Sequence, residues 1–256
     1  VTLLGFAVLC VWATIVLASI IGLPGQSSSN SSGGSQVASS GSSASSTPGM
    51  GSVNGVAFGP GEGSIADANR DGNVYIWQVG DLQSNSPIDL FDTPPISLGV
   101  NSVAFSPNGT LLAAGDDNDN IYLWRWTLAR RPHITLPTNT NCGGVYGVAF
   151  SHDGTLVTAA CWDGLVYLWQ VSNSSLSGPP LQARTAGINS VAFSPAGNLL
   201  AAGDANGHVY LWNVTSRKLI ANLSTPPPNG EVSSGEVYGV AFSHDGKLLA
   251  ASSRDG

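Results

Sequence analysis

The chain has 256 residues, of which 42% are hydrophobic and only 10% are charged, and 16 acidic against 9 basic side chains give a net charge of -7. Soluble domains usually carry about a quarter charged residues, so this composition indicates a local bias along the chain. The acidic balance argues against a protein held on phosphate backbones, because such proteins gather lysine and arginine, and we expect no nucleic-acid partner. The 3 cysteines lack a CxxC spacing, which argues against a disulfide scaffold and a zinc site.

Residues 1–23 form an uncharged and mostly apolar run, VTLLGFAVLCVWATIVLASIIGL. At about 1.5 Å per residue, a helix of this length reaches about 34 Å, enough to cross a hydrocarbon core of about 30 Å. The alternatives are a cleaved signal peptide and a buried core helix. A signal peptide typically has about 7 to 15 apolar residues after a basic stretch, whereas this run is longer and nothing basic precedes it. The pattern therefore favours a transmembrane helix over 1–23.

Residues 24–52 are dominated by serine and glycine, as in SSSNSSGGS and ASSGSSASS. Such a segment buries too little apolar surface to offset its ordering entropy, which predicts a flexible linker with a reach of roughly 30 Å. Cytoplasmic flanks of membrane helices are usually rich in lysine and arginine, but the first basic residue here is Arg70. We therefore expect a single-pass membrane protein whose C-terminal part lies on the extracytoplasmic side.

From residue 53 the chain repeats one unit. The copies begin with VNGVAF, VNSVAF, VYGVAF, INSVAF and VYGVAF at Val53, Val100, Val145, Ile188 and Val237. Each complete copy ends in an aromatic strand whose last residue is Trp77, Trp124, Trp169 or Trp212, and the interval from the motif Phe to this Trp is 19 residues every time. A rigid unit with variable connections predicts repeats at 53–99, 100–144, 145–187 and 188–236, with a partial copy at 237–256.

Each unit reads as short strands separated by turns. A Val-x-x-Val-Ala-Phe strand precedes a turn, a small-residue strand such as LLAAG follows, and a DG or NG turn leads into the Tyr/Trp strand. A fourth, less regular strand fits the gaps, for example at 133–136 and 218–224. Four antiparallel strands per unit describe one blade of a β-propeller.

The VAFSPxGxLLAxG...DGxVxLW skeleton resembles the WD-repeat β-propeller family over residues 53–256. The resemblance implies an all-β fold of about four and a half blades, truncated before the ring closes, after one transmembrane helix. It also implies structural roles for the turn and strand residues of each repeat, which are Asp71, Trp77, Asn118, Trp124, Asp163, Trp169, Asn206, Trp212 and Asp255. The chain departs from the family in having no His before any first strand and no Asp after the strand Trp.

The copies alternate in kind. Copies two and four have Asn after the first residue and Asn at the turn, whereas copies three and five have Tyr and Asp. The period is therefore near two blades, which duplication of a blade pair would explain.

Two columns of the repeat change chemistry within this constant frame. The residue before the turn Asp or Asn reads Arg70, Asp117, Trp162, Ala205 and Arg254, and the second residue of the first strand reads Asn54, Asn101, Tyr146, Asn189 and Tyr238. The resemblance implies that both columns line one mouth of the propeller, where family members dock partners. Aromatic and Arg side chains are good interface anchors. The alternative is that Tyr146, Trp162 and Tyr238 only cover neighbouring blades.

The search for catalytic and metal chemistry gives weak candidates. Residues 67–72 match the opening of a calcium loop, but the twelfth position is Gln78 in place of a bidentate Glu. No nucleophile elbow, P-loop, HExxH or paired-carboxylate pattern occurs, so we expect no catalysis, metal or cofactor in these residues. Cys142 and Cys161 fall in one blade and suggest a disulfide there, with two free buried thiols as the equal alternative.

These observations predict a membrane-tethered, non-enzymatic propeller that binds a protein or peptide ligand. The order of apolar run, linker and repeats resembles the sensor half of bacterial receptor-like serine/threonine kinases with WD repeats, which implies a kinase domain before residue 1. A secreted scaffold and a propeller enzyme are the competing interpretations.

Overall fold

The computed structural model describes residues 52–61, 63–78, 88–89, 99–125, 133–137, 142–183, 187–224 and 235–254. The predicted transmembrane helix, the predicted linker apart from its last residue, and the predicted structural residue Asp255 lie outside the described residues. Within the described ranges, no helix is long and apolar enough to cross a membrane.

The described part of the chain contains antiparallel β-strands and no helix, which confirms the predicted all-β class. The strands form five sheets, here called blades 1 to 5 in chain order. Blade 1 consists of β1 (Val53–Phe58), β2 (Ser64–Asn69), β3 (Val74–Gln78) and β4 (Ile88–Asp89). Blade 2 consists of β5 (Val100–Phe105), β6 (Leu112–Asp116), β7 (Ile121–Trp124) and β8 (His133–Leu136).

Blade 3 consists of β9 (Val145–Phe150), β10 (Leu156–Cys161), β11 (Leu165–Gln170), β12 (Ser175–Leu176) and β13 (Leu181–Gln182). Blade 4 consists of β14 (Ile188–Phe193), β15 (Leu199–Asp204), β16 (His208–Asn213) and β17 (Leu219–Ser224). The described strands of blade 5 are β18 (Val237–Phe242) and β19 (Leu249–Ser253).

Within each blade the inner strands pair in chain order, because short turns connect them. The predicted DG turn of blade 3 places Gly164 at φ 80°, a conformation that costs glycine little. The predicted fourth strand at 133–136 is β8, and the one predicted at 218–224 is β17, which begins one residue later. In blade 3 the fourth strand is split, since β12 and β13 both pair with β11.

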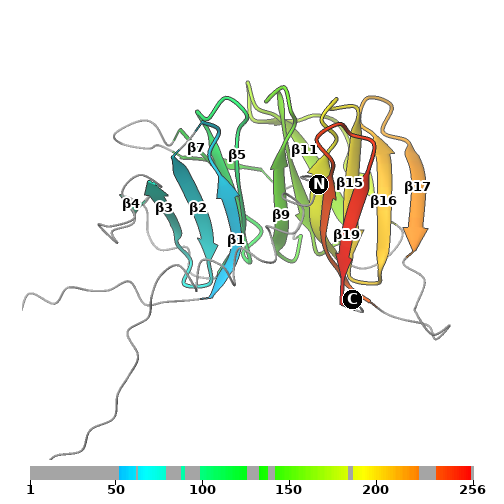
Figure 1. Ribbon diagram of the computed structural model, residues 1–256, viewed down its shortest axis with the longest axis horizontal. Coiled ribbons are helices and arrows are strands. Elements are labelled where there is room, and N and C mark those ends of the chain that lie inside the picture. The colour runs from blue at the N-terminus through cyan, green and yellow to red at the C-terminus, as the bar shows by residue number, and fades with distance from the viewer. Residues whose placement is uncertain are drawn as a thin grey trace, which may run out of the picture.

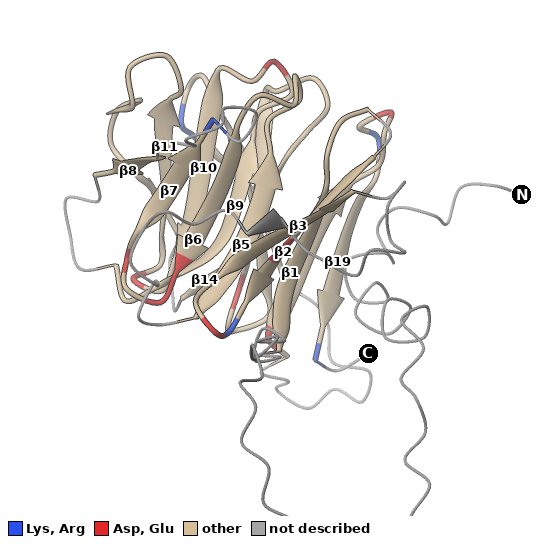
Figure 2. Ribbon diagram, turned by 90° about the vertical axis from the view of Figure 1, so that its left-hand side faces the viewer, with Lys and Arg blue, Asp and Glu red and all other residues tan. Residues whose placement is uncertain are grey.

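The blades stand side by side in a curved row, as an incomplete ring of propeller blades (Figure 1). The first strands contact one another from blade to blade along this row. Charged residues lie mainly at the turns and strand ends, at the two edges of the blades (Figure 2). The inner strands of each blade are accordingly filled with small and apolar residues.

The hydrophobic core lies between successive blades. Trp124, Trp169 and Trp212 are at most 1% exposed, and each packs against the blade before its own. Burial of such a side chain contributes about 3 to 5 kcal/mol, judged by the cost of truncating it. Trp77 of blade 1 is only half-buried, because no described blade precedes it. Three of the four predicted structural tryptophans are therefore buried between described blades.

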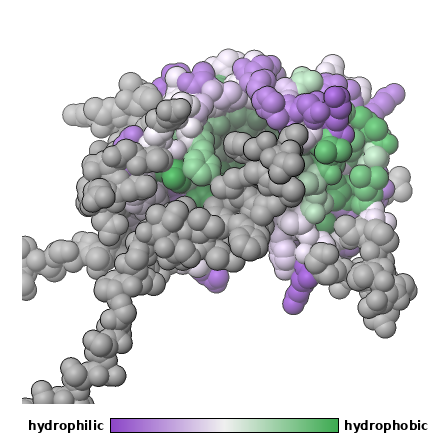
Figure 3. Space-filling view, in the orientation of Figure 1, coloured by the Kyte–Doolittle hydropathy of each residue, from purple (hydrophilic) through white to green (hydrophobic). Residues whose placement is uncertain are grey.

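Blade 4 leaves apolar side chains at the surface. Leu219, Ile220 and Leu223 of β17 are exposed, and Figure 3 shows hydrophobic surface on the flank where β17 lies. In the outer strands of blades 2 and 3, Leu136 and Leu181 are buried, whereas Ile134 is exposed.

Candidate partner-binding site

The loops between second and third strands come together at one edge of the blades, which we call the mouth. It is the edge at which β1 begins and β19 ends, at the bottom of Figure 1. The backbone N–H groups of Arg70, Asp117, Trp162, Ala205 and Arg254 donate to the carbonyls of Ser52, Gly99, Gly144, Gly187 and Glu236, over 2.9 to 3.1 Å. This bond recurs in every blade and fixes the five residues at equivalent positions. The first predicted column therefore lies at one edge.

The second column lies beside it, at a β-bulge. In blades 1, 2, 4 and 5 the pairing of the first and second strands skips the second residue of the first strand, and blade 3 has its irregularity at the same place. A bulge leaves one residue out of the ladder and redirects its side chain. The residues so released are Asn54, Asn101, Tyr146, Asn189 and Tyr238.

The asparagines of this column hold blades together. The side-chain amides of Asn54, Asn101 and Asn189 donate to the carbonyls that open the next blade, at Val100 (2.9 Å), Val145 (3.2 Å) and Val237 (3.2 Å). The Asn101 amide also donates to Asp117 Oδ1 at 2.6 Å. These amides are therefore engaged within the fold, a role that the sequence comparison of columns missed.

The two aromatic residues of blade 3 meet at the mouth. The rings of Tyr146 and Trp162 have centroids 5.4 Å apart at 45°. A Cβ placed on Gly187 of blade 4 would lie 2.2 Å from Trp162 Cε3, so the indole rests directly on that glycine. Trp162 is still 46% exposed. It both covers the neighbouring blade and offers a face to solvent.

Tyr146 lies in a negative field. Its partial burial raises the pKa of its phenol, and the nearby Asp117 carboxylate raises this pKa further. Tyr238, the equivalent residue of blade 5, is 52% exposed, and its hydroxyl donates to Glu236 Oε2 at 3.0 Å.

In each of blades 1 to 4 one carboxylate at this turn accepts the hydroxyl hydrogen bond of a tyrosine, and the position of this carboxylate alternates. In blades 1 and 3 the predicted residues Asp71 and Asp163 accept the hydroxyl hydrogen bonds of Tyr75 (2.8 Å) and Tyr167 (2.9 Å). In blades 2 and 4 the predicted turn residues are Asn118 and Asn206, and the acceptors lie two residues earlier. These acceptors are Asp116, bonded by Tyr122 (3.3 Å), and Asp204, bonded by Tyr210 (3.2 Å).

Sequence reasoning missed these two buried carboxylates and the four tyrosines. A signal was present, since the pairs Asn69/Asp71, Asp116/Asn118, Cys161/Asp163 and Asp204/Asn206 each contain one Asp. Asp116 Oδ1 also accepts the backbone N–H groups of Asn118 and Asn120 at 2.9 and 2.8 Å. Burial raises the pKa of the Asp116 carboxyl, although these bonds oppose the rise.

Comparison with known families identifies the family to which these repeats belong. The family described as "WD domain, G-beta repeat" matches residues 91–125, 131–170, 174–213 and 226–256, which is more than half of the chain. The chain belongs to the WD40-repeat family. Comparison with curated proteins gave no match. WD40 domains are generally non-catalytic and typically mediate protein–protein interactions.

The WD40 matches are offset from the blades. The match at 131–170 begins before β8, the outer strand of blade 2, and ends with β11 of blade 3. The strands β1, β2 and β3 precede all four matches, yet they pair like the first three strands of blades 2 to 4.

The two cysteines of WD40 blade 3 are free, buried thiols. The structure therefore contains two free buried thiols, and the predicted disulfide between Cys142 and Cys161 is not formed. The Cys142 thiol donates to the carbonyl of Gly144 at 3.6 Å. A hydrogen bond with Cys142 and burial both raise the pKa of the Cys161 thiol. The thiols are therefore in contact, and Cys161 is held protonated.

The acidic residues of the calcium-loop match are divided between a strand and a turn. In the proposed calcium loop, Asp67 lies in β2, while Asp71 lies in the turn and accepts from Tyr75. Burial raises the pKa of Asp67 to about 7, although the Tyr75 backbone N–H hydrogen bond lowers it. Among the described residues no group of three or more His, Cys, Asp or Glu could hold a metal ion. His152 and His244 are exposed turn residues.

Proposed function

We propose that this WD40-repeat chain is a non-enzymatic scaffold whose mouth binds a protein or peptide ligand through Tyr146 and Trp162. We further propose that residues 1–23 tether it to a membrane with the blades on the extracytoplasmic side. The observation that carries the binding proposal is the exposed aromatic pair. The tether is supported by the apolar run and by the lack of basic residues near it.

The aromatic pair has the properties of an interface anchor. Trp162 is supported on one side by Tyr146 and on another by Gly187, so little side-chain entropy remains to be lost when a partner binds. Almost half of its surface faces solvent. Trp and Tyr are enriched among the residues that contribute most to binding.

The surrounding charges favour a basic anchor on the ligand. Asp117 lies close enough to raise the pKa of Tyr146, and Asp163 follows Trp162 in the chain. A lysine or arginine side chain over an aromatic face gains about 0.5 to 2 kcal/mol, and the carboxylates add attraction. The expected ligand is a segment that presents a basic side chain to blade 3.

The test measures binding of capped synthetic peptides that contain one Arg or Lys, by fluorescence polarisation with the full 256-residue chain. Trp162→Ala is expected to weaken the best peptides at least tenfold, because a central Trp anchor is worth about 2 kcal/mol or more. Phe58→Ala is the matched control, since Phe58 is 55% exposed and ends β1 at the edge opposite the mouth. Equal affinities for the two variants would place the binding site elsewhere.

A further inference from the structure

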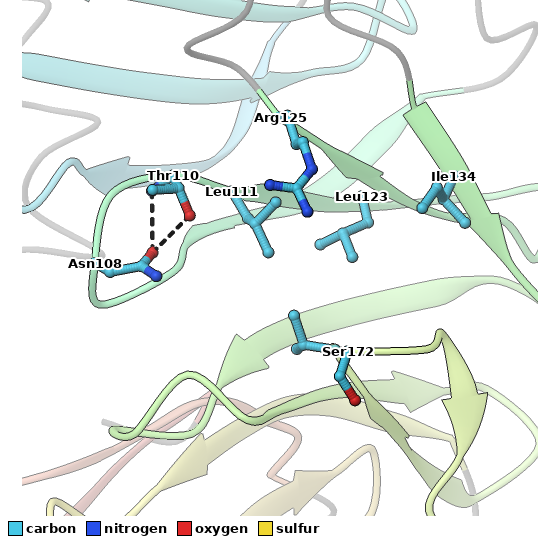
Figure 4. Close-up of a pocket in the computed structure, with 8 residues that line it drawn as sticks. Asn108, Thr110, Leu111, Leu123, Arg125, Ile134 and Ser172 are labelled. Carbon is cyan, nitrogen blue, oxygen red and sulfur yellow. Dashed lines mark hydrogen bonds between the residues drawn. The ribbon is translucent and has the colours of Figure 1, made fainter.

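A concave surface lies between blades 2 and 3, away from the mouth. We call it the side groove, and its volume is about 410 Å³. Its apolar walls are Leu111, Leu123 and Ile134 of blade 2 and Val171 of blade 3, and the polar residues Asn108 and Arg125 lie at its rim (Figure 4). A volume of this order is typical of sites that hold a small ligand or a few side chains.

The side groove has a buried apolar base and an apolar wall that is open to solvent. Leu123 is only 4% exposed at its base, whereas Ile134 on β8 is 51% exposed. At the corresponding junction between blades 3 and 4, Arg217 spans the blades, and its guanidinium donates to the carbonyls of Ser177 and Pro179. The residue equivalent to Arg217 in blade 3 is Ser174, with the same φ of 57°. A serine side chain is too short to bridge to blade 2 in this way.

The rim of the side groove presents hydrogen-bond donors. Arg125 is exposed, and within the described ranges no carboxylate lies at ion-pair distance from it. Asn108 accepts through its carbonyl from the Ser106 hydroxyl and from the N–H and hydroxyl of Thr110. Its amide nitrogen is left to face the groove (Figure 4). The described residues that line the groove include no Asp or Glu, although the chain as a whole has a charge of -7.

The cation is specific to this blade. The residue that follows the strand Trp is Gln78, Gln170 or Asn213 in the other blades, and only blade 2 has Arg at this position. Arg125 therefore supplies a positive charge beside an apolar floor at one junction. The complement of an unpaired guanidinium is a carboxylate, which it binds through two parallel hydrogen bonds.

We propose that the side groove binds an extended segment of a partner protein with an aliphatic side chain next to Asp or Glu. The aliphatic side chain fills the space between Leu123, Ile134 and Val171, and the acidic side chain pairs with Arg125. This site is independent of the mouth, because it lies at another part of the blades and selects the opposite charge.

The experiment uses the full chain and capped synthetic peptides in which Leu-Asp or Ile-Glu is flanked by serine and glycine. Affinities are measured by fluorescence polarisation for the wild type and for Arg125→Gln, which introduces the residue that blades 1 and 3 already have. Lys218→Gln is the matched control, because it removes one exposed positive charge immediately before β17. Each peptide is also made with Asn or Gln in place of its acidic residue.

Arg125→Gln is expected to weaken the acidic peptides about fivefold to tenfold and to leave their amide versions unchanged, while Lys218→Gln has no effect. The double-mutant cycle between Arg125 and the peptide carboxylate then gives a coupling that only direct contact produces. The proposal is overturned if no acidic–aliphatic peptide binds, or if the cycle shows no coupling. It is also overturned if Trp162→Ala, and not Arg125→Gln, removes binding.

Discussion

The three junctions among blades 2 to 5 are of two kinds, and the difference lies in which strand comes close to the neighbouring blade. At the junction of blades 2 and 3, the Asn101 amide donates to the Val145 carbonyl and the Ser102 hydroxyl accepts the Val148 N–H at 3.1 Å. Blades 4 and 5 repeat this pair of bonds through Asn189 and Ser190. A polar staple thus joins each even-numbered blade to the next.

The junction of blades 3 and 4 is built differently. Tyr146 and Gly147 replace the Asn–Ser pair, and a Cβ on Gly147 would lie 3.2 Å from both the carbonyl oxygen of Asn189 and the Cα of Ser190. The backbones therefore approach closely, and Trp162 covers the edge of this contact. Close packing takes the place of the two side-chain hydrogen bonds.

The strand that carries the glycine differs between the two kinds of junction. In blade 2, Ser102 pairs across the strands with Gly115, and in blade 3, Gly147 pairs with Ala160. A Cβ on Gly115 would lie 2.3 Å from Val145 Cγ1, and the same distance separates a Cβ on Gly203 from Val237. The residues at these two paired positions therefore differ together between successive blades. The pair of blades is thus the structural unit of the repeat.

Blade 1 combines features of both kinds of junction, and it also buries a carboxyl group that should make stability depend on pH. It combines Asn54 with Gly55, and it buries Asp67 where blades 2 and 4 have Ala114 and Ala202. Because the pKa of Asp67 rises from 3.8 to about 7 on folding, the folded state binds the proton more tightly than the unfolded state. Stability should therefore fall as pH rises from about 4 to about 7, by up to about 4 kcal/mol at about 1.4 kcal/mol per pH unit.

Urea unfolding of the full chain across pH 4 to 8 measures this loss. Asp67→Asn should flatten that part of the profile, because an amide does not ionise. The same loss of stability with rising pH in Asp67→Asn would show that another group is responsible.

Gly115→Ala should break the stapled junction. The added methyl group overlaps Val145, and overpacking of this kind typically costs about 1 to 3 kcal/mol. Ala160→Gly makes the opposite change at the equivalent position of blade 3 and should cost only about 0.5 to 1 kcal/mol, mainly in backbone entropy. Chemical denaturation of both variants makes the comparison. Equal losses would mean that the two junctions do not differ in this contact.

Exchange of the turn carboxylate should convert one kind of blade into the other. Asp116→Asn removes an acceptor of the Tyr122 hydroxyl and is expected to cost about 1 to 2 kcal/mol. Asp116→Asn with Asn118→Asp recreates the Asn69/Asp71 arrangement of blade 1 and should regain most of this loss. Thermal unfolding of the single and double variants gives the coupling. If the stability losses of the two single substitutions simply add in the double variant, the carboxylate cannot be exchanged between positions 116 and 118.

Much of the blade could be predicted from the residues. The constant interval between Phe and Trp and the DG and NG turns identified the inner strands, because these short-range patterns fix where a strand begins and turns. The outer strands were harder to predict, since β4, β12 and β13 have two residues each. The two columns at the mouth were found because their residues vary between repeats. The hydrogen bonds of Asn101 and Asn189 were not predicted, because their partners lie in the next blade.

The sequence alone determined the repeat, its two-blade period and the equivalent positions of Arg70, Asp117, Trp162, Ala205 and Arg254, because local spacing governs these. Only the tertiary structure decided which side chains are engaged within the fold and which face solvent. Asn101 is tied to Val145, Trp162 rests on Gly187 yet remains exposed, and Arg125 lies beside an apolar groove. These differences depend on contacts between blades, which bring together residues some 45 positions apart, and no pattern within one repeat contains them.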